Sequence, residues 1–230
     1  MEITSFTYDD PDDDGDITLD MSITFNNDSD DDIDLLRYSV LIQADSLIAA
    51  AENIEEDICI EAGEVEQMSI STPYVKRFES PLKGTVMVSG FHKSMISLGE
   101  VDIPQEAGSS YLPLNKKICD GVTAIGAGII RNKPDSDADI GVDFLVVIQN
   151  NSSQLLDQAK LRVQVFKKNS DDVYDETPSG EDIPPHSCKA IVGWWRTKKG
   201  KLNGAKARLT LFWHTPVSHK SAEAVATPEE

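Results

Sequence analysis

The sequence is poor in cysteine, with three residues at positions 59, 119 and 188 among 230. An odd number without paired spacing argues against a disulfide framework of the kind that staples small secreted proteins. The cysteines therefore fit reduced thiols in a cytosolic setting. We expect Cys119 to be the most exposed of the three, because it lies in a segment that reads as a linker.

Long apolar stretches are also missing, since no run approaches the roughly 20 residues that a membrane-spanning helix needs. The first five residues, Met1–Ser5, contain neither a basic nor an apolar region. We therefore expect no secretory signal, no membrane span and a cytoplasmic location. A mature form of an exported protein would look the same, so export stays open.

The four histidines are scattered through the chain and have no serine or aspartate at the spacing of a known catalytic motif. Gly-rich phosphate loops, His-Cys metal spacings and nucleophile elbows are not recognisable either. Abundant carboxylates alone do not make an acid–base pair. The sequence therefore predicts a protein that is not an enzyme.

Basic residues are few, since 21 Lys and Arg stand against 40 Asp and Glu, which gives a net charge of −19. Such a charge disfavours nucleic acid as a partner of the whole molecule. The segment from His186 to Lys220 is the exception, because it contains no acid and holds Lys189, Arg196, Lys198, Lys199, Lys201, Lys206, Arg208 and Lys220. This asymmetry indicates an interaction surface.

The chain also repeats itself. A shift of 123 positions aligns Ile3–Ile42 with Gly126–Val165 without a gap. Identical residues then meet at ten positions: Pro11, Asp12, Asp14, Asp16, Ile17, Asp20, Asn27, Ser29, Asp34 and Val40. Such agreement predicts a duplicated module of about 100 residues.

Each copy reads as a series of short strands. Apolar residues alternate with polar ones through Asp16–Phe25, Leu35–Ala44 and Ala205–His214, with turn residues between such runs. The sequence thus predicts an all-β protein of two tandem immunoglobulin-like β-sandwich domains from an internal duplication.

The predicted boundaries follow from composition. Residues 1–104 form the first repeat, with its last two strands at 84–91 and 94–103 joined by a turn near His92. Residues 105–119 are the linker, because they contain Gly108 and Pro113. Residues 120–218 form the second repeat, and the polar residues 219–230 are a disordered tail.

Three stretches, Ile23–Ser29, Tyr38–Ile42 and Ile60–Glu64, resemble small bacterial and plant immunoglobulin-like modules of the FxLYD type and the late-embryogenesis-abundant water-stress type. The resemblance covers about half of each module. The second copy departs from it, because Pro184-Pro185-His186 replaces the glycine turn. The resemblance implies a binding or accessory module without an active site.

The first acidic loop, Asp10–Gly15, matches the opening D-x-D-x-D-G of a calcium loop. The twelfth position would be Met21, which offers no oxygen, and the second copy begins with Lys133. A calcium site formed by Asp12, Asp14 and Asp16 is one alternative, and a solvated acidic turn is the other. No other cofactor is expected.

The basic segment carries the predicted partner surface: Trp194, Trp195, Arg196, Lys198, Lys199 and Lys201. Adjacent strand residues point to opposite faces, so one tryptophan of the pair faces outward, while Trp213 belongs to the core. We expect a structural or protein-interaction protein that binds itself or another protein, with homo-oligomers formed between the acidic first module and this basic edge. A calcium- or carbohydrate-binding accessory module is the alternative, and an enzyme of unknown type comes third.

Overall fold

The computed structural model describes residues 1–76, 80–167, 174–176 and 180–228. These residues are almost entirely strand, with one short helix, α1 (Lys199–Leu202), so the predicted all-β class is confirmed. Within the described ranges no helix is long and apolar enough to cross a membrane. The chain divides into two compact units, unit 1 (Met1–Lys93 and Pro216–Glu230) and unit 2 (Ser94–Thr215).

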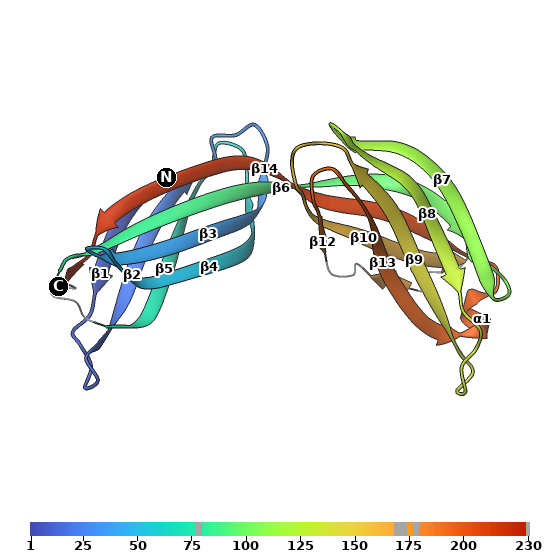
Figure 1. Cartoon of the computed structure of the whole chain (residues 1–230), viewed down its shortest axis with the longest axis horizontal. Coiled ribbons are helices and arrows are strands. Elements are labelled where there is room, and N and C mark those ends of the chain that lie inside the picture. The colour runs from blue at the N-terminus through green and yellow to red at the C-terminus, as the bar shows by residue number, and fades with distance from the viewer. Residues whose placement is uncertain (77–79, 168–173, 177–179, 229–230) are drawn as a thin grey trace. The chain divides into compact units, whose positions relative to one another are not determined.

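Unit 1 contains two layers of β-sheet (Figure 1). One sheet has the strand order β15 (Thr227–Pro228), β1 (Glu2–Tyr8), β2 (Asp16–Asn26) and β5 (Val65–Lys76). The other contains part of β14 (Ala205–Val225), part of β6 (Leu82–Asp102), β3 (Ile33–Ala44) and β4 (Leu47–Ile60). The alternation predicted for β2 and β3 is confirmed, because their apolar residues are buried between the sheets.

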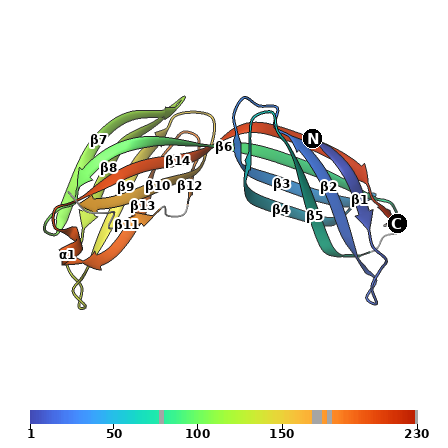
Figure 2. The same cartoon turned by 180° about the vertical axis from the view of Figure 1, so that it is seen from behind.

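Unit 2 also contains two layers, which the view from behind separates clearly (Figure 2). One sheet has the order β13 (Ser187–Lys198), β9 (Asp139–Asn150), β8 (Val122–Arg131) and β7 (Gly108–Cys119). The other contains β11 (Tyr174–Glu176), β10 (Leu156–Lys167) and the remaining parts of β14 and β6, with β12 (Glu181–Ile183) paired to β10.

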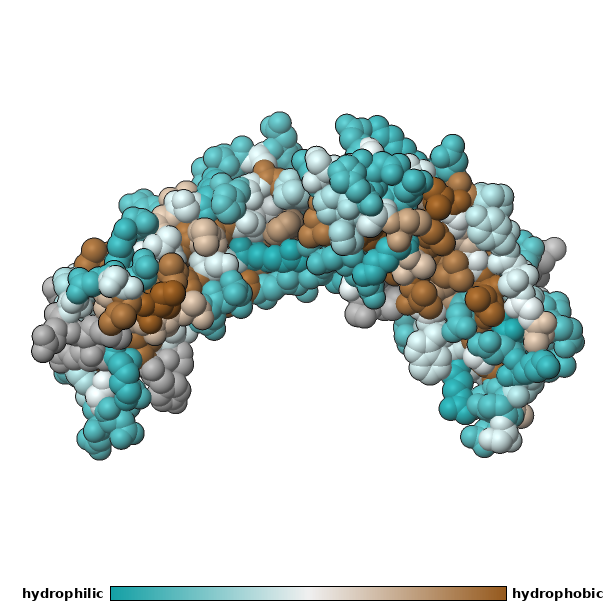
Figure 3. Space-filling model, in the orientation of Figure 1, coloured by the Kyte–Doolittle hydropathy of each residue, from teal (hydrophilic) through white to brown (hydrophobic). Residues whose placement is uncertain are grey.

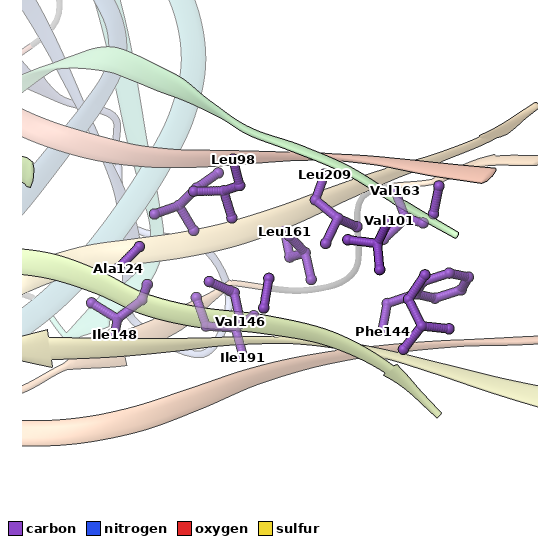
Figure 4. Packing of buried hydrophobic residues seen from close by; sticks show 14 of the residues in the cluster. Leu98, Val101, Ala124, Phe144, Val146, Ile148, Leu161, Val163, Ile191 and Leu209 are labelled. Carbon is purple, nitrogen blue, oxygen red and sulfur yellow. The ribbon is translucent and has the colours of Figure 1, made fainter. Parts of the chain in front are cut away.

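The core of unit 2 lies between these sheets. Figure 4 shows Val146 and Ile148 of β9 pointing toward side chains of β6, β10 and β14, such as Leu98, Leu161 and Leu209. Leu98 and Val101 of β6 are buried in this core, although the strand begins in unit 1.

Strands β6 and β14 each contribute to both units, which corrects three predictions. The expected turn near His92 is absent, because β6 runs on through residue 102. The expected linker 105–119 is mostly strand β7, which pairs with β8 inside unit 2. The expected disordered tail begins with the last part of β14, and Ala226 beyond it is buried in the core of unit 1.

The residues that directly follow β6 and β14 make matching hydrogen bonds. Ile103 N donates to Ala205 O at 3.2 Å in unit 2, and Ala226 N donates to Leu82 O at 2.8 Å in unit 1. Both donors and both acceptors differ by 123 in residue number. The end of each long strand is thus tied to the start of the other.

Candidate interaction surface

The acidic loops are built by their own carboxylates. Asp12 Oδ1 accepts the backbone N–H groups of Asp14 and Asp16, both at 2.9 Å. At the positions 123 residues later, Asp135 Oδ1 accepts those of Asp137 and Asp139, both at 3.0 Å. Carboxylates commonly close turns in this way. Asp12 and Asp135 thus have the same structural role in the two loops.

A lysine from the neighbouring strand holds each acidic loop. Lys76 of β5 pairs with Asp16 and donates to Asp14 O at 3.1 Å. Lys198 of β13 pairs with Asp139 at 2.5 Å and donates to Asp137 O at 2.9 Å. Among the residues that the structure describes, no group of three or more His, Cys, Asp or Glu side chains is arranged to hold a metal ion.

Arg196 joins the second loop as well. Its guanidinium lies 3.6 Å from Asp137 and 3.5 Å from Asp139, and it donates to Asp135 at 2.5 Å. Burial works to raise the pKa of Asp135, but the backbone N–H groups of Asp139 and Asp137 and then Arg196 outweigh it, so this pKa lies below its ordinary value. Two of the four predicted partner-binding cations are therefore engaged with acids of their own unit.

The other two cations, Lys199 and Lys201, lie in α1 and are exposed. The helix is short and follows β13 directly. Lys167 of β10 donates to the carbonyl of Gly200 at 2.7 Å, which ties α1 to the rest of unit 2.

The three tryptophans have different surroundings. Trp213 is 7% exposed and lies in the core, as predicted. Trp195 is half-buried and stacks on Tyr174, with ring centroids 4.8 Å apart, and Tyr174 stacks in turn on Phe144 at 6.3 Å. Trp194 points the other way and is 64% exposed. The outward tryptophan of the predicted pair is thus Trp194.

Trp194 lies beside an apolar row that crosses the whole sheet. Val192 is opposite Leu145, Leu145 is opposite Gly128, and Gly128 is opposite Tyr111. Directly paired residues of a sheet point to the same face. Val192 is 56% exposed and Tyr111 is 66% exposed, so this row lies on the outer face of unit 2.

The rows on either side add further apolar groups. Ala190 is opposite Val147 in one row, and in the other Trp194 is opposite Asp143, which is itself opposite Ile130. We call these side chains the unit-2 outer face: Tyr111, Ile130, Leu145, Val147, Ala190, Val192 and Trp194. Hydrophobic atoms gather over the layer of β8, β9 and β13 in the space-filling view (Figure 3).

Unit 1 provides the comparison within the same chain. At the positions 123 residues earlier, Leu145, Val147, Ala190, Val192 and Trp194 correspond to Ser22, Thr24, Gln67, Ser69 and Ser71. The pairing is also the same, because Ser22 is opposite Ser69, Thr24 opposite Gln67 and Asp20 opposite Ser71. The same sheet positions are therefore polar in unit 1 and apolar in unit 2.

Charge divides between the units just as sharply. Unit 1 holds 6 of the 21 Lys and Arg residues and 25 of the 40 Asp and Glu residues, a net charge of −19. Unit 2 holds the other 15 basic and 15 acidic residues, which cancel. The whole net charge of the protein thus belongs to unit 1, whereas the apolar outer face belongs to a neutral unit.

Unit 1 contains two further candidates, a Ser–His pair that could be catalytic and a polar cavity that could bind a ligand. Ser89 Oγ and His219 Nδ1 lie 2.9 Å apart, but in the described part of the chain no carboxylate pairs with this imidazole, as a nucleophile's base requires. A polar cavity of about 540 Å³ lies nearby, lined by Met1, Asp28, Ser29 and residues 217–221. Lys220 in its wall already pairs with Asp28 at 2.8 Å and donates to Asn26 O at 2.6 Å.

None of the three cysteines forms a disulfide bond. Cys59 and Cys188 are exposed and Cys119 is half-buried, so the expectation that Cys119 would be the most exposed is wrong. Its side chain packs against the core of unit 2, and burial raises the pKa of this thiol.

Comparison with known proteins gives no family. No protein-family model matches the chain, and no curated protein matches it. Similar solved structures include red sea bream transglutaminase (9% identity, 100% of this chain, 32% of that chain, TM-score 0.24) and a putative beta-galactosidase from Bacteroides fragilis (11%, 91%, 32%, 0.28). The chain spans about a third of the length of each. Likeness at this level carries no information about activity.

The outer face was missed at the level of sequence, although a signal for it exists. Residues 145, 147, 190, 192 and 194 each align with a serine, threonine or glutamine at the offset of 123. A comparison of residues 123 positions apart, with attention to strand positions that face outward, isolates this set. Of this set the sequence analysis names Trp194, as one of two adjacent tryptophans of which one must face outward.

Proposed function

We propose that this protein is a non-catalytic interaction protein built from two copies of an immunoglobulin-like sandwich, with the unit-2 outer face as its binding surface for a partner protein. A likeness to FxLYD-type and water-stress modules belongs to the same proposal. The observation that carries it is the contrast between Ser22, Ser69 and Ser71 in unit 1 and Leu145, Val192 and Trp194 in unit 2.

The contrast matters because it separates the needs of the fold from those of binding. Both units place these side chains on the outward face of a sheet with the same pairing. Unit 1 fills the positions with small polar residues, so a sandwich of this kind does not need apolar groups there. Contiguous exposed apolar groups on a protein surface commonly mark an interaction site.

The composition of the face also suits a protein partner. Trp194 and Tyr111 are large aromatic groups with more than half of their surface exposed, and aromatic residues dominate the binding energy of protein interfaces. The aliphatic groups between them, Val192 and Leu145, give the continuous apolar surface that the centre of an interface requires.

The charged half of the predicted surface takes a smaller part in this proposal. Arg196 and Lys198 already pair with Asp135, Asp137 and Asp139, so they are not free to attract the acidic module of another copy. They fix the end of β13 and hence the position of Trp194. Lys199 and Lys201 of α1 remain as exposed cations.

Reciprocal exchange of the two sets of residues tests the proposal. The variant Leu145→Ser, Val192→Ser, Trp194→Ser gives unit 2 the residues of unit 1, and Ser22→Leu, Ser69→Val, Ser71→Trp does the reverse. We expect the native wild-type protein to enhance the fluorescence of an apolar dye, the first variant to lose this signal, and the double exchange to restore it. Equal signals from all three proteins, with melting curves that show them folded, would overturn the proposal.

A further inference from the structure

The partner chemistry follows from combining the unit-2 outer face with the charge division, and this step rests on the proposed function. We infer that the partner is a basic protein segment, in which apolar side chains that contact Trp194 and Val192 are accompanied by lysine or arginine. A second copy of this chain and an acidic partner are the alternatives that the charges disfavour.

The first step is the charge of the approaching molecule. Unit 1 carries a net charge of −19 and unit 2 carries none, and both belong to one chain. An approaching molecule therefore meets a protein with a net charge of −19. Attraction of this kind raises the rate of association with a cation and lowers it for an anion.

The second step concerns the face itself, which presents little charge of its own. Asp143 lies within the three rows, and Asn132 Nδ2 donates to its Oδ2 at 3.1 Å. At the end of β13, Arg196 lies against three aspartates, and Lys198 pairs with one of them. Arg196 and Lys198 are thus matched by acids, which leaves Lys199 and Lys201 of α1 as the exposed cations that follow β13.

The third step is the area. Four strands about 4.8 Å apart and three rows about 7 Å apart cover roughly 400 Å². A stable dimer usually buries about 800 Å² on each partner. Pairing of two unit-2 outer faces would therefore bury too little surface, while it brings together two molecules of charge −19. A basic segment of another protein adds electrostatic attraction to the same small apolar contact.

The fourth step is the anchor. Trp194 is 64% exposed, and it is flanked on β13 by the exposed Val192 and by Arg196. On the far strand the ring of Tyr111 lies over Gly126, where a side chain would have no space. Apolar side chains of the partner can thus lie between two aromatic groups, over Leu145 and over Gly128 of β8, which adds no side chain to the face.

Peptides of defined composition test the inference with the full-length protein. One fluorescent probe alternates leucine and lysine among serines, a second replaces each lysine by glutamate, and a third replaces each leucine by serine. Anisotropy titrations use the wild type and the Leu145→Ser, Val192→Ser, Trp194→Ser variant. We expect the leucine–lysine peptide to bind the wild type about tenfold or more tighter than either other peptide.

The variant and the salt dependence separate the two contributions. The exchange to serine should remove the advantage of leucine over serine in the probe, since the apolar contact is gone. Added salt should weaken the leucine–lysine peptide, because screening shortens from about 10 Å at 0.1 M to about 3 Å at 1 M. A Trp194→Ser single variant, the mildest change, should fall between wild type and triple variant.

The outcomes distinguish this inference from the proposed function. If the lysine and glutamate peptides bind equally and both lose affinity in the variant, the unit-2 outer face is a binding surface but the inference of a basic partner is wrong. If the wild type self-associates in light scattering and the variant does not, the occupant is a second copy and the inference is again wrong. If no peptide distinguishes wild type from variant, and neither protein self-associates, the proposed function falls together with it.

Discussion

Asn27 and Asn150 lie 123 residues apart and make the same hydrogen bond across each sandwich. Asn27 Nδ2 donates to Ile60 O and Asn150 Nδ2 donates to Ile183 O, both at 3.0 Å, and the two acceptors are also 123 residues apart. Both amides are fully buried. Each also accepts a serine hydroxyl, from Ser29 at 2.6 Å and Ser152 at 2.7 Å.

We predict that Asn27→Ala and Asn150→Ala each destabilise their own unit by about 2–4 kcal/mol, because buried carbonyls and N–H groups lose their partner. Denaturant unfolding, followed by hydrogen exchange to assign the unit, measures this. Ser22→Ala on the exposed face of β2 is the matched control and should change little. A loss below about 0.5 kcal/mol in both asparagine variants would contradict a structural role for the pair.

Ala138 offers a stabilising test. It has φ +60°, and its counterpart in the first acidic loop is Gly15, with φ +75°. A residue with a Cβ is disfavoured in this left-handed region, so Ala138→Gly should raise the free energy of unfolding of unit 2 by about 1 kcal/mol. The reverse change, Gly15→Ala, should destabilise unit 1. Equal stability of Ala138→Gly and wild type would show that the loop relaxes to suit alanine.

Removal of residues 216–230 should unfold unit 1 and leave unit 2 intact. These residues supply the last part of β14, the buried Ala226, and Lys220, whose Nζ lies 5.3 Å from the centre of the Phe25 ring. Hydrogen exchange should show protection lost in β2 and kept in β9. Addition of a peptide of residues 216–228 is the control and should restore protection, because it supplies the missing strand.

Preserved protection of β2 without that peptide would mean that unit 1 closes on its own. The prediction depends on β6, whose residues 82–93 would lose their β14 neighbour in the truncated protein and gain an open sheet edge.

For the acidic loop we predict equal melting temperatures in millimolar calcium and in chelator. Asp12 already accepts two backbone N–H groups and Asp16 is paired with Lys76, so a calcium ion would have to displace these partners. A ligand that binds only the native state would raise stability by mass action. A rise in melting temperature with calcium that disappears in Asp12→Asn, Asp14→Asn, Asp16→Asn would instead establish the site.

Much of the fold is readable from alternation and from the offset of 123. The strand Asp16–Asn26 buries every second residue, and Ile33–Ala44 does so from Leu36 onward, which matches the alternation of apolar and polar residues in the sequence. The error at residues 92–93 had a physical signal, since His92-Lys93 is not a turn-forming pair and the chain continues through them as strand.

The linker and the tail were harder to predict. Pro113 argues against a central strand, but β7 is the edge of its sheet, where a missing N–H costs no hydrogen bond within the sheet. Residues 219–225 are polar with only small apolar groups, and their partner in β6 lies more than a hundred residues earlier. Local composition holds no trace of such a distant pairing.

The pairing of Arg196 and Lys198 was within reach of the sequence. The register that places Lys198 opposite Asp139 and Arg196 opposite Gly141 follows once β9 and β13 are taken as neighbours. Cross-strand opposite charges attract. What the sequence did not supply was this neighbour relation, so the cations were interpreted as free.

The sharing of β14 has a consequence for synthesis. Translation delivers residues 1–93 before unit 2 and residues 216–228 after it, so unit 1 is without this part of β14 until the whole of unit 2 has left the ribosome. Until then the edge of β6 stays open, and a neighbouring nascent chain on the same polysome carries the strand that fits it. Synthesis proceeds from the N-terminus, so unit 1 is started before unit 2 but completes its sheet after unit 2.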